Sequence, residues 1–284
     1  MSEPRDSGRG GKQWAVVLGV SSGTGAAVAR AVARDPGLNV FGVHRGHYPD
    51  LAEGVARDVR ATGHQVHLRC GDAGTPEGVV QGADELLAVV GKHSVRLMVH
   101  SIANAAVGLL ASGGETQLRV QQVHKTFDAM AHSFVYWTQE MLARELLAPG
   151  AQLLGLTNPM DEQVVRNTAL IGATKAALAV YVRHLAHELG PLGYRVNLIR
   201  FGAVRTHAVE RTFGSARLAA LEQALQRSIP ARRLCTLEEV ARLAALLAGD
   251  TLSWFNGAVI DFTGGESQGF FDPLIEALRE KGNG

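Results

Sequence analysis

A chain of 284 residues, of which 46% are hydrophobic, can bury one large core. Its 28 basic and 27 acidic residues give a formal net charge of +1, which argues against broad nucleic-acid binding, because phosphate affinity needs a concentrated basic surface. The two cysteines, Cys70 and Cys235, suit a reducing compartment, and no apolar run approaches the roughly 20 residues that cross a bilayer. We therefore expect a cytoplasmic protein with neither nucleic acid nor membrane as a partner.

Predicted strands and helices alternate along the chain after a polar, glycine-rich arm at residues 1–12, which we expect to be disordered. We expect strands at 14–18, 39–43, 65–69, 96–100, 152–157, 195–201 and 258–262, and helices at 26–34, 51–62, 77–90, 126–147, 168–189, 218–228 and 237–248. Thr236 and Glu239 have the spacing of a capping box before the last helix. This alternation predicts an α/β fold, a Rossmann-type doubly wound parallel sheet, with residues 13–284 as a single domain.

A turn rich in glycine and serine, GVSSGTG at residues 19–25, closes the first predicted strand and opens the first predicted helix. Gly19 permits a tight turn, and the small residues let backbone N–H groups approach a pyrophosphate at the positive end of the helix dipole. Because this turn lies inside a βαβ unit, it predicts a dinucleotide site. The turn residues expected to bind the cofactor are Gly19, Ser21, Ser22, Gly23 and Gly25.

The second predicted strand is followed by His44 and Arg45, where NAD-binding proteins usually place an acidic residue for the ribose 2′-hydroxyl. Arg45 can pair bidentately with a 2′-phosphate, and no carboxylate stands there to repel it, so NADP(H) is the predicted cofactor. Asp72 follows the third strand, at the edge of the sheet where an adenine would lie. Small residues from Ser101 onward follow the fourth strand, where they admit a ribose.

Several segments, and the order in which they follow one another, resemble the short-chain dehydrogenase/reductase superfamily, and most closely its divergent branch, the enoyl-acyl-carrier-protein reductases. They are GVSSGTG, CGDAG, VHSIANA, FDAMAHSFVYWTQEML and GATKAALAVYVRHLAHELGPLGYRVNLIRFGAVRT, and the resemblance runs from about Gly19 to Gly265. The resemblance implies roles by position. Gly19, Ser21 and Ser22 would line the pyrophosphate, Asp72 and Ala73 the adenine, Ser101 and Ile102 the nicotinamide ribose, Lys175 the ribose hydroxyls, and Val204 and Thr206 the carboxamide.

The sequence departs from the family at its active-site tyrosine. The enoyl reductases carry this residue seven positions before the lysine, which is Thr168 here, and the commoner spacing of four gives Ile171. The aromatic residue that these enzymes carry ten positions before the tyrosine is replaced by Asn158. A threonine hydroxyl is a much weaker acid than a phenol, whose pKa is roughly 10, so it can donate a hydrogen bond but is a poor general acid near pH 7. The residues expected at the reacting centre are Lys175, Thr168, Asn158 and Thr157.

Three functions are compatible with a scaffold that has lost the phenol. The first is an NADP(H)-dependent reductase of an activated C=C or C=N bond in an acyl or polyketide-like substrate, with the proton taken from water, from Thr168 or from a histidine. The second is a non-redox cyclase or isomerase, and the third is a non-catalytic NADP(H)-binding sensor or structural protein. The intact phosphate-binding turn and Lys175 favour the first.

The spacing of the remaining histidines matches no metal-ligand pattern, so no metal is predicted. None of the remaining tyrosines lies at the position of the missing phenol. Tyr181 lies six residues after Lys175, on a helix face expected to pack against another helix or subunit. His132 is the histidine expected to face the substrate cleft. Residues 206–213, with His207, Glu210 and Arg211, are expected to form a substrate lid. The wide apolar faces of the helices at 126–147 and 168–189 predict a homodimer or homotetramer.

Overall fold

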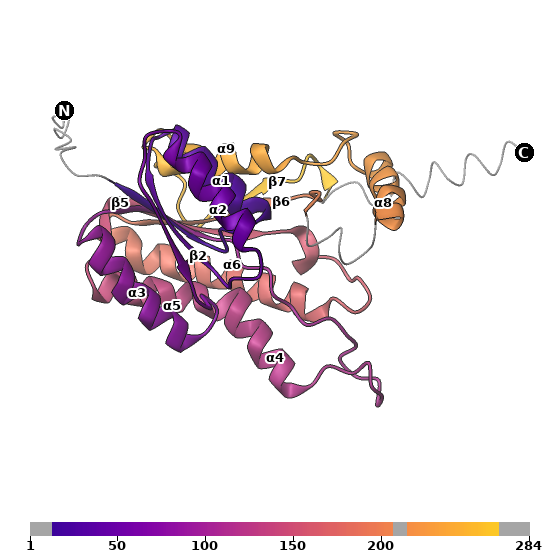
Figure 1. Ribbon diagram of the computed structural model, residues 1–284. Coiled ribbons are helices and arrows are strands. Elements are labelled where there is room, and N and C mark those ends of the chain that lie inside the picture. The colour runs from indigo at the N-terminus through magenta and orange to yellow at the C-terminus, as the bar shows by residue number, and fades with distance from the viewer. Residues whose placement is uncertain (1–12, 207–214, 267–284) are drawn as a thin grey trace, which may run out of the picture.

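The computed structural model describes residues 13–206 and 215–266, and these form one parallel sheet covered by helices (Figure 1). Its seven strands lie in the order β3-β2-β1-β4-β5-β6-β7. The strands are β1 (Trp14–Leu18), β2 (Asn39–His44), β3 (Val66–Cys70), β4 (Val95–His100), β5 (Leu147–Thr157), β6 (Arg195–Phe201) and β7 (Val259–Phe262). The crossover after β3 returns the chain to the other side of β1, and this reversal leaves a crevice at the carboxyl ends of β1 and β4.

Helices cover both faces of the sheet, because its central strands are apolar on both sides. One face packs against α1 (Gly23–Arg34), α2 (Pro49–Arg60) and α9 (Leu237–Ala248). The other packs against α3 (Pro76–Val90), α5 (Ser133–Ala143) and α6 (Ala169–Leu189). The remaining helical elements are α4 (Val120–Phe127), η1 (Asp128–His132), η2 (Pro159–Asp161), η3 (Gly190–Leu192) and α8 (Ser215–Ser228). Figure 1 shows the two helical layers above and below the strands.

The predicted fold class is confirmed, and most predicted elements are present with their ends shifted by a few residues. The capping box of α9 is also confirmed, since the Thr236 hydroxyl accepts from Glu239 N at 3.2 Å and the Glu239 carboxylate accepts from Thr236 N at 2.9 Å. No helix in the described ranges is both long enough and apolar enough to cross a membrane. Cys70 and Cys235 are both free thiols.

The prediction of one helix over residues 126–147 is wrong. The structure begins the helix at Val120, interrupts it with the π-helical turn η1, ends it at Ala143 and starts β5 at Leu147. Glu145 adopts a φ of 55°, a left-handed conformation that ends a helix. Apolar spacing alone does not reveal where the helix ends, because Leu142 before Glu145 and Leu146 after it continue the helical spacing of apolar residues.

Candidate cofactor and active site

The turn between β1 and α1 is packed so closely that side chains are excluded from it. Gly19 has a φ of +94°, and a Cβ there would lie 2.4 Å from the Ser101 carbonyl oxygen. A Cβ on Gly25 would lie 2.2 Å from the Gly19 carbonyl oxygen. Ser22 is the N-cap of α1 and makes no side-chain hydrogen bond to the helix, so its first N–H groups remain available to an anion.

This turn forms one wall of a cavity of about 630 Å³ at the carboxyl ends of β1, β2 and β4. The structure brings most of the predicted cofactor-binding residues together around it, and these are Gly19, Ser21, Ser22, Gly23, Arg45, Asp72, Ala73, Ser101, Ile102 and Thr206. Gly25 lies behind the turn, Val204 is half-buried in the same loop as Thr206, and Lys175 lies deeper, under β5. His47, Tyr48 and Asn104 also line the cavity, and the sequence analysis did not single them out.

The part of this cavity next to β2 has a basic character. Arg45 is exposed, and it lines the cavity together with His44 and His47. Asp72 is the one acidic residue among the described lining residues, and its Oδ1 already accepts from Gly74 N at 2.9 Å. His44 Nδ1 accepts from Gly46 N at 3.2 Å, and burial lowers the pKa of this histidine, which disfavours the charged ring. Arg45 is therefore the permanent positive charge of this wall.

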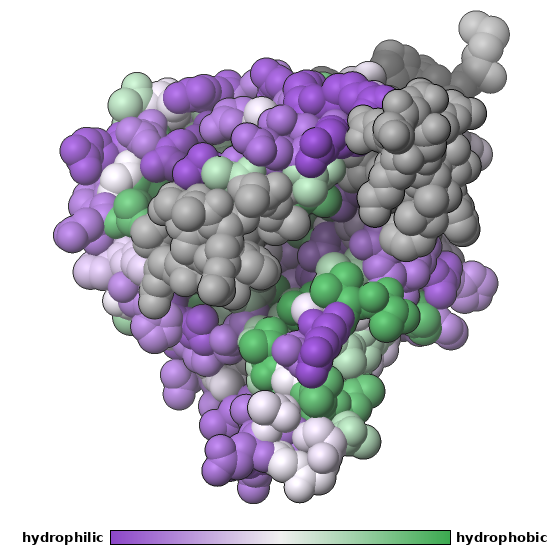
Figure 2. Space-filling view, turned by 90° about the vertical axis from the view of Figure 1, so that its right-hand side faces the viewer, coloured by the Kyte–Doolittle hydropathy of each residue, from purple (hydrophilic) through white to green (hydrophobic). Residues whose placement is uncertain are grey.

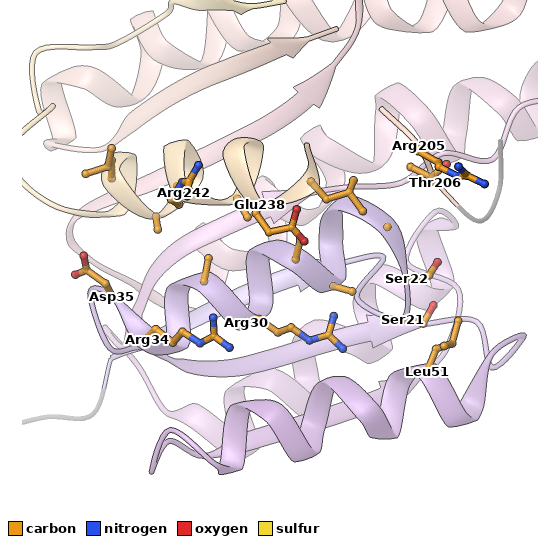
Figure 3. A pocket seen from close by; sticks show the side chains of 18 residues that line it. Ser21, Ser22, Arg30, Arg34, Asp35, Leu51, Arg205, Thr206, Glu238 and Arg242 are labelled. Carbon is orange, nitrogen blue, oxygen red and sulfur yellow. The ribbon is translucent and has the colours of Figure 1, made fainter. Parts of the chain in front are cut away.

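A second, larger cavity of about 920 Å³ lies between α1 and α9 and shares Ser21, Ser22, Gly23 and Thr206 with the first. Figure 3 shows Arg30 and Arg34 from α1 and Arg242 and Glu238 from α9 along it, with Ser21, Ser22 and Thr206 at one end. The glycine-rich turn thus separates two cavities. Only the first of them also reaches Arg45, Asp72 and Ser101.

Lys175 is held on the buried face of α6. Only 6% of the residue is exposed, and its Nζ donates to the carbonyl oxygen of Leu156 at 2.9 Å. Burial lowers the pKa of Lys175 to about 8, and the charge of Asp161 acts in the opposite direction. An ammonium group has three hydrogens, so two of them remain for other acceptors after the bond to Leu156. This leaves Lys175 able to hold a ribose diol.

The three other predicted catalytic residues flank the segment that joins β5 to α6. Thr157 is buried at the end of β5, and its hydroxyl donates to the Asn158 carbonyl at 3.4 Å. Asn158 Oδ1 accepts from Met160 N at 3.3 Å, which caps η2 and leaves the amide nitrogen Nδ2 as a donor. Thr168 is the N-cap of α6, and its hydroxyl hydrogen is donated to the Val165 carbonyl at 2.8 Å. In this arrangement Asn158 has a donor to offer, whereas Thr168 has none.

His100, at the end of β4, is fully buried beneath this site. Its Nε2 lies 2.8 Å from Ser133 Oγ, which in turn lies 2.9 Å from the Ala129 carbonyl oxygen of the π-helical turn. Because the serine has a single hydroxyl hydrogen, which goes to that carbonyl, the ring nitrogen must be the donor to Ser133. Burial, followed by the charge of Lys175, lowers the pKa of His100 to about 3, so the ring stays neutral.

His132 is half-buried and is not among the residues that line the cavity at the glycine-rich turn. Its Nδ1 lies 3.0 Å from the Tyr181 hydroxyl, and its ring lies against Phe127, Tyr136 and Tyr181. Tyr181 thus packs against another helical element, as predicted. His207, Glu210 and Arg211 lie outside the described residues. Within the described ranges, no cluster of three histidine, cysteine or acidic residues could hold a metal ion.

An ion-pair cluster beside Lys175 was missed by the sequence analysis. Arg200 Nη2 donates to Asp161 Oδ2 at 3.0 Å and lies 2.8 Å from Glu162 Oε1. The side chains of Arg200 and Asp161 are 13% and 8% exposed, whereas that of Glu162 is 58% exposed. The signal was an arginine next to the last residue of a predicted strand, but the sequence does not show which acid it meets.

Exposed apolar side chains gather on the face where these loops lie. Figure 1 places the loops after β4 and after β5 on its right-hand side, and Figure 2 shows apolar residues below a hollow on that face. Gly108 N donates to the Asn167 carbonyl at 2.9 Å, which joins the two loops. The exposed apolar residues of the loops are Val107, Leu110, Val164 and Val165. An apolar rim of this kind fits a ligand with an apolar part.

Comparison with known proteins gives a consistent picture. The family model described as "Enoyl-(Acyl carrier protein) reductase" matches residues 19–267. The chain is 28% identical over 270 residues to the 1-cyclohexenylcarbonyl-CoA reductase of Streptomyces collinus, covering 94% of this chain and 92% of that protein. It is 31% identical over 186 residues to the enoyl-acyl-carrier-protein reductase (NADH) of Escherichia coli, covering 65% of this chain and 69% of that one.

Solved structures show the same fold at low sequence identity. The L-sorbose reductase of Gluconobacter frateurii, solved with NADPH and L-sorbose, has a TM-score of 0.79 at 20% identity, covering 91% of this chain and 97% of its own. A short-chain dehydrogenase from Burkholderia cenocepacia, solved with NADP, has a TM-score of 0.75 at 22% identity, covering 90% and 98%. At these identities the likeness is evidence of fold alone.

Proposed function

This chain belongs to the enoyl-(acyl carrier protein) reductase family of short-chain dehydrogenases/reductases, and we propose that it is an NADP(H)-dependent reductase of an activated C=C or C=N bond in an acyl or polyketide-like thioester. The observation that carries the proposal is that the chain has both a phosphate-binding type of turn and a buried lysine. The glycine-rich turn leaves no room for side chains and lines a cavity that also carries Arg45. Lys175 is buried under β5, where its charge acts on His100, the residue before the cavity-lining Ser101.

The residues present fit a dinucleotide phosphate. A Cβ on Gly19 or Gly25 would collide with a backbone carbonyl oxygen and displace the turn, and the uncapped N–H groups of α1 suit a pyrophosphate. Arg45 suits a 2′-phosphate, Asp72 and Ala73 an adenine, and Lys175 a ribose diol. The bound cofactor supplies the hydride for the reduction. The Escherichia coli enzyme is an NADH enzyme by name, whereas the Gluconobacter frateurii structure holds NADPH, so the choice of NADP(H) here rests on Arg45.

In the proposed mechanism, the chain orients the substrate and stabilises the negative charge that develops on its carbonyl oxygen. The amide nitrogen of Asn158 is the donor for that oxygen, because Oδ1 is engaged with Met160 N and Nδ2 is not engaged by it. The proton that completes the reduction comes from water. Thr168 has given its hydrogen to Val165, His100 is neutral and fully buried, and His132 lies in the aromatic cluster.

The proposed substrate class is an enoyl thioester with an apolar acyl group. The apolar rim formed by Val107, Leu110, Val164 and Val165 supports an apolar acyl part. The match to a 1-cyclohexenylcarbonyl-CoA reductase over nearly the whole of both chains supports a conjugated C=C bond next to a thioester.

The test is NADPH oxidation by the purified protein with a panel of enoyl-CoA, β-keto and imine substrates that includes 1-cyclohexenylcarbonyl-CoA. We expect loss of absorbance at the nicotinamide band with at least one enoyl thioester. Conversion of a substrate without NADPH oxidation would instead identify a cyclase or isomerase. Cofactor binding without conversion of any substrate would identify a sensor or structural protein, and either result would refute the reductase.

Assembly and location are proposals of the same kind. We propose a homodimer or homotetramer, supported by exposed apolar residues that include Val180 on α6, Leu192 on η3 and Trp254, of which Trp254 is 98% exposed. Light scattering after size-exclusion chromatography measures the mass and distinguishes both assemblies from a monomer. A cytoplasmic location is supported by the free thiols of Cys70 and Cys235.

A further inference from the structure

Asp161 and Arg200 form an ion pair that joins the β5–α6 segment to the sheet. Asp161 ends the short helix η2, three residues after Asn158, and Arg200 lies on β6 directly opposite Thr157 of β5 in the parallel ladder. The 3.0 Å bond between Arg200 Nη2 and Asp161 Oδ2 therefore fixes η2 at the carboxyl ends of the central strands. Asn158, which we propose as the donor to the substrate oxygen, is the N-cap of that same helix.

The pair is unusual in that each partner keeps one buried polar atom without a hydrogen bond. These atoms are Asp161 Oδ1 and Arg200 Nε. A buried carboxylate oxygen without a donor is costly, and nearly all such groups in folded proteins have a partner. Glu162, the other carboxylate that pairs with Arg200, is mostly exposed, so water can hydrogen-bond to its oxygens. Asp161 Oδ1 therefore has the capacity to accept a hydrogen bond that the described residues do not supply.

The donor that suits this oxygen is Lys175. Helix η2 packs against α6, which carries the lysine, and the ammonium has two hydrogens left after its bond to the Leu156 carbonyl. The charge of Asp161 raises the pKa of Lys175 against the larger effect of burial. The titratable group that faces the lysine from β4 is His100, which stays neutral, and the charge on β6 is Arg200, which is paired with Asp161 and Glu162.

We propose that Asp161, held in place by Arg200, is a positioning residue for Lys175, and that its Oδ1 accepts a hydrogen bond from a water molecule that in turn accepts one from the lysine ammonium. In a site without the phenol that other members of the family place beside the lysine, this carboxylate keeps the ammonium charged and aimed at the cofactor ribose. The inference rests on the proposed function, because it takes Lys175 as the ligand of that ribose.

The test is the pH dependence of NADPH binding, followed by nicotinamide fluorescence, for wild type, Asp161→Asn, Asp161→Glu and Glu162→Gln. An opposite charge within about 4–6 Å shifts a pKa by about 1–3 units. For Asp161→Asn we therefore expect the alkaline midpoint of binding to move to lower pH by about one unit. Asp161→Glu keeps the charge and is expected to stay near wild type. Glu162→Gln removes an equal charge from Arg200 and is the matched control, with no shift expected.

The outcomes separate this inference from the proposed function. A wild type that binds NADPH, with an Asp161→Asn midpoint that does not move, overturns the positioning role and leaves the reductase standing. An equal shift in Glu162→Gln also overturns it, because a general change of charge would then explain the effect. Failure of the wild type to bind NADPH at any pH overturns the proposed function itself. If Asp161→Asn does not fold, the double variant Asp161→Asn/Arg200→Met removes both charges, and a downward shift is expected that is smaller than in Asp161→Asn, because loss of the Arg200 charge acts in the opposite direction; no shift at all would overturn the positioning role.

Discussion

The ammonium nitrogen of Lys175 lies 2.9 Å from the carbonyl oxygen of Leu156, which ties α6 to the end of β5. This bond fixes the direction of a long, flexible side chain at the edge of the sheet where the cofactor cavity opens. Burial lowers the pKa of the same group to about 8. The lysine is therefore positively charged below that pH and loses its charge as the pH rises through it.

We expect NADPH affinity to be highest below pH 8 and to fall as the pH rises through the pKa of Lys175, because a neutral amine holds the ribose hydroxyls less strongly. Lys175→Ala is expected to weaken binding and to remove this alkaline fall. Calorimetric titrations between pH 6.5 and 9.5 measure both effects. Lys125→Ala changes an exposed lysine on α4 and serves as the control. Wild-type affinity in Lys175→Ala would show that the lysine has no part in binding.

Arg45 is expected to select the phosphorylated dinucleotide. A charge-assisted bond to the 2′-phosphate contributes about 1–3 kcal/mol, so NADPH should bind about tenfold or more tightly than NADH. Arg45→Ala should remove most of this preference by weakening NADPH binding and leaving NADH nearly unchanged. Arg57→Ala, which removes an exposed arginine of α2, is the matched control. Equal affinities of the wild type for the two cofactors would contradict the assignment.

Introducing a phenol at position 168 tests whether the site is that of a reductase. Thr168→Tyr is expected to leave the fold intact and to raise the reduction of an ordinary enoyl thioester, provided that the ring fits beside Asn158. Thr168→Val removes the hydrogen bond to Val165, at a cost of about 1 kcal/mol in stability, and is expected to retain turnover because water supplies the proton. Steady-state NADPH oxidation compares the three proteins. If Thr168→Val folds like the wild type but no longer turns over substrate, Thr168 rather than water is the proton donor.

The glycine-rich turn is expected to tolerate no side chain at Gly25. A Cβ there would lie 2.2 Å from the Gly19 carbonyl, so Gly25→Ala must displace backbone and should destabilise the protein by about 1–3 kcal/mol while weakening NADPH binding. Gly54→Ala is the matched control, because nothing lies within 4 Å of a Cβ at that position in α2, and a gain of about 0.5–1 kcal/mol is expected. Urea unfolding of both variants measures these changes, and equal stabilities would refute the packing argument.

The capping box of α9 is expected to contribute to stability independently of the cofactor. Thr236→Ala removes the hydroxyl that accepts from Glu239 N and should cost about 1 kcal/mol. Ser22→Ala is a useful contrast, because Ser22 is an N-cap without a side-chain bond to its helix, so its loss should leave the free energy of unfolding of the unliganded protein unchanged. Thermal unfolding without cofactor distinguishes the two. An equal loss in both variants would contradict this account.

The sequence by itself predicted the features that depend on neighbours in the chain. Apolar strands alternating with amphipathic helices led to the doubly wound sheet, because periodicity reports which faces of an element are buried. The turn at residues 19–25 and the capping box at Thr236 could also be predicted from the sequence, because each depends on residues a few positions apart. The spacing between Lys175 and Thr168 led to the prediction that the family's phenol is missing, and this stays a prediction.

Tertiary structure alone decided the features that join distant segments. The π-helical turn at Asp128–His132 and the bond from His100 to Ser133 depend on packing between β4 and the helix that crosses it, which no local pattern records. Arg200 binds Asp161 across 39 positions of sequence, and the pKa of Lys175 is lowered by burial, which the sequence around the lysine does not reveal. Periodicity is set by adjacent residues, whereas the electrostatics of this site are set by which charges the folded chain encloses together.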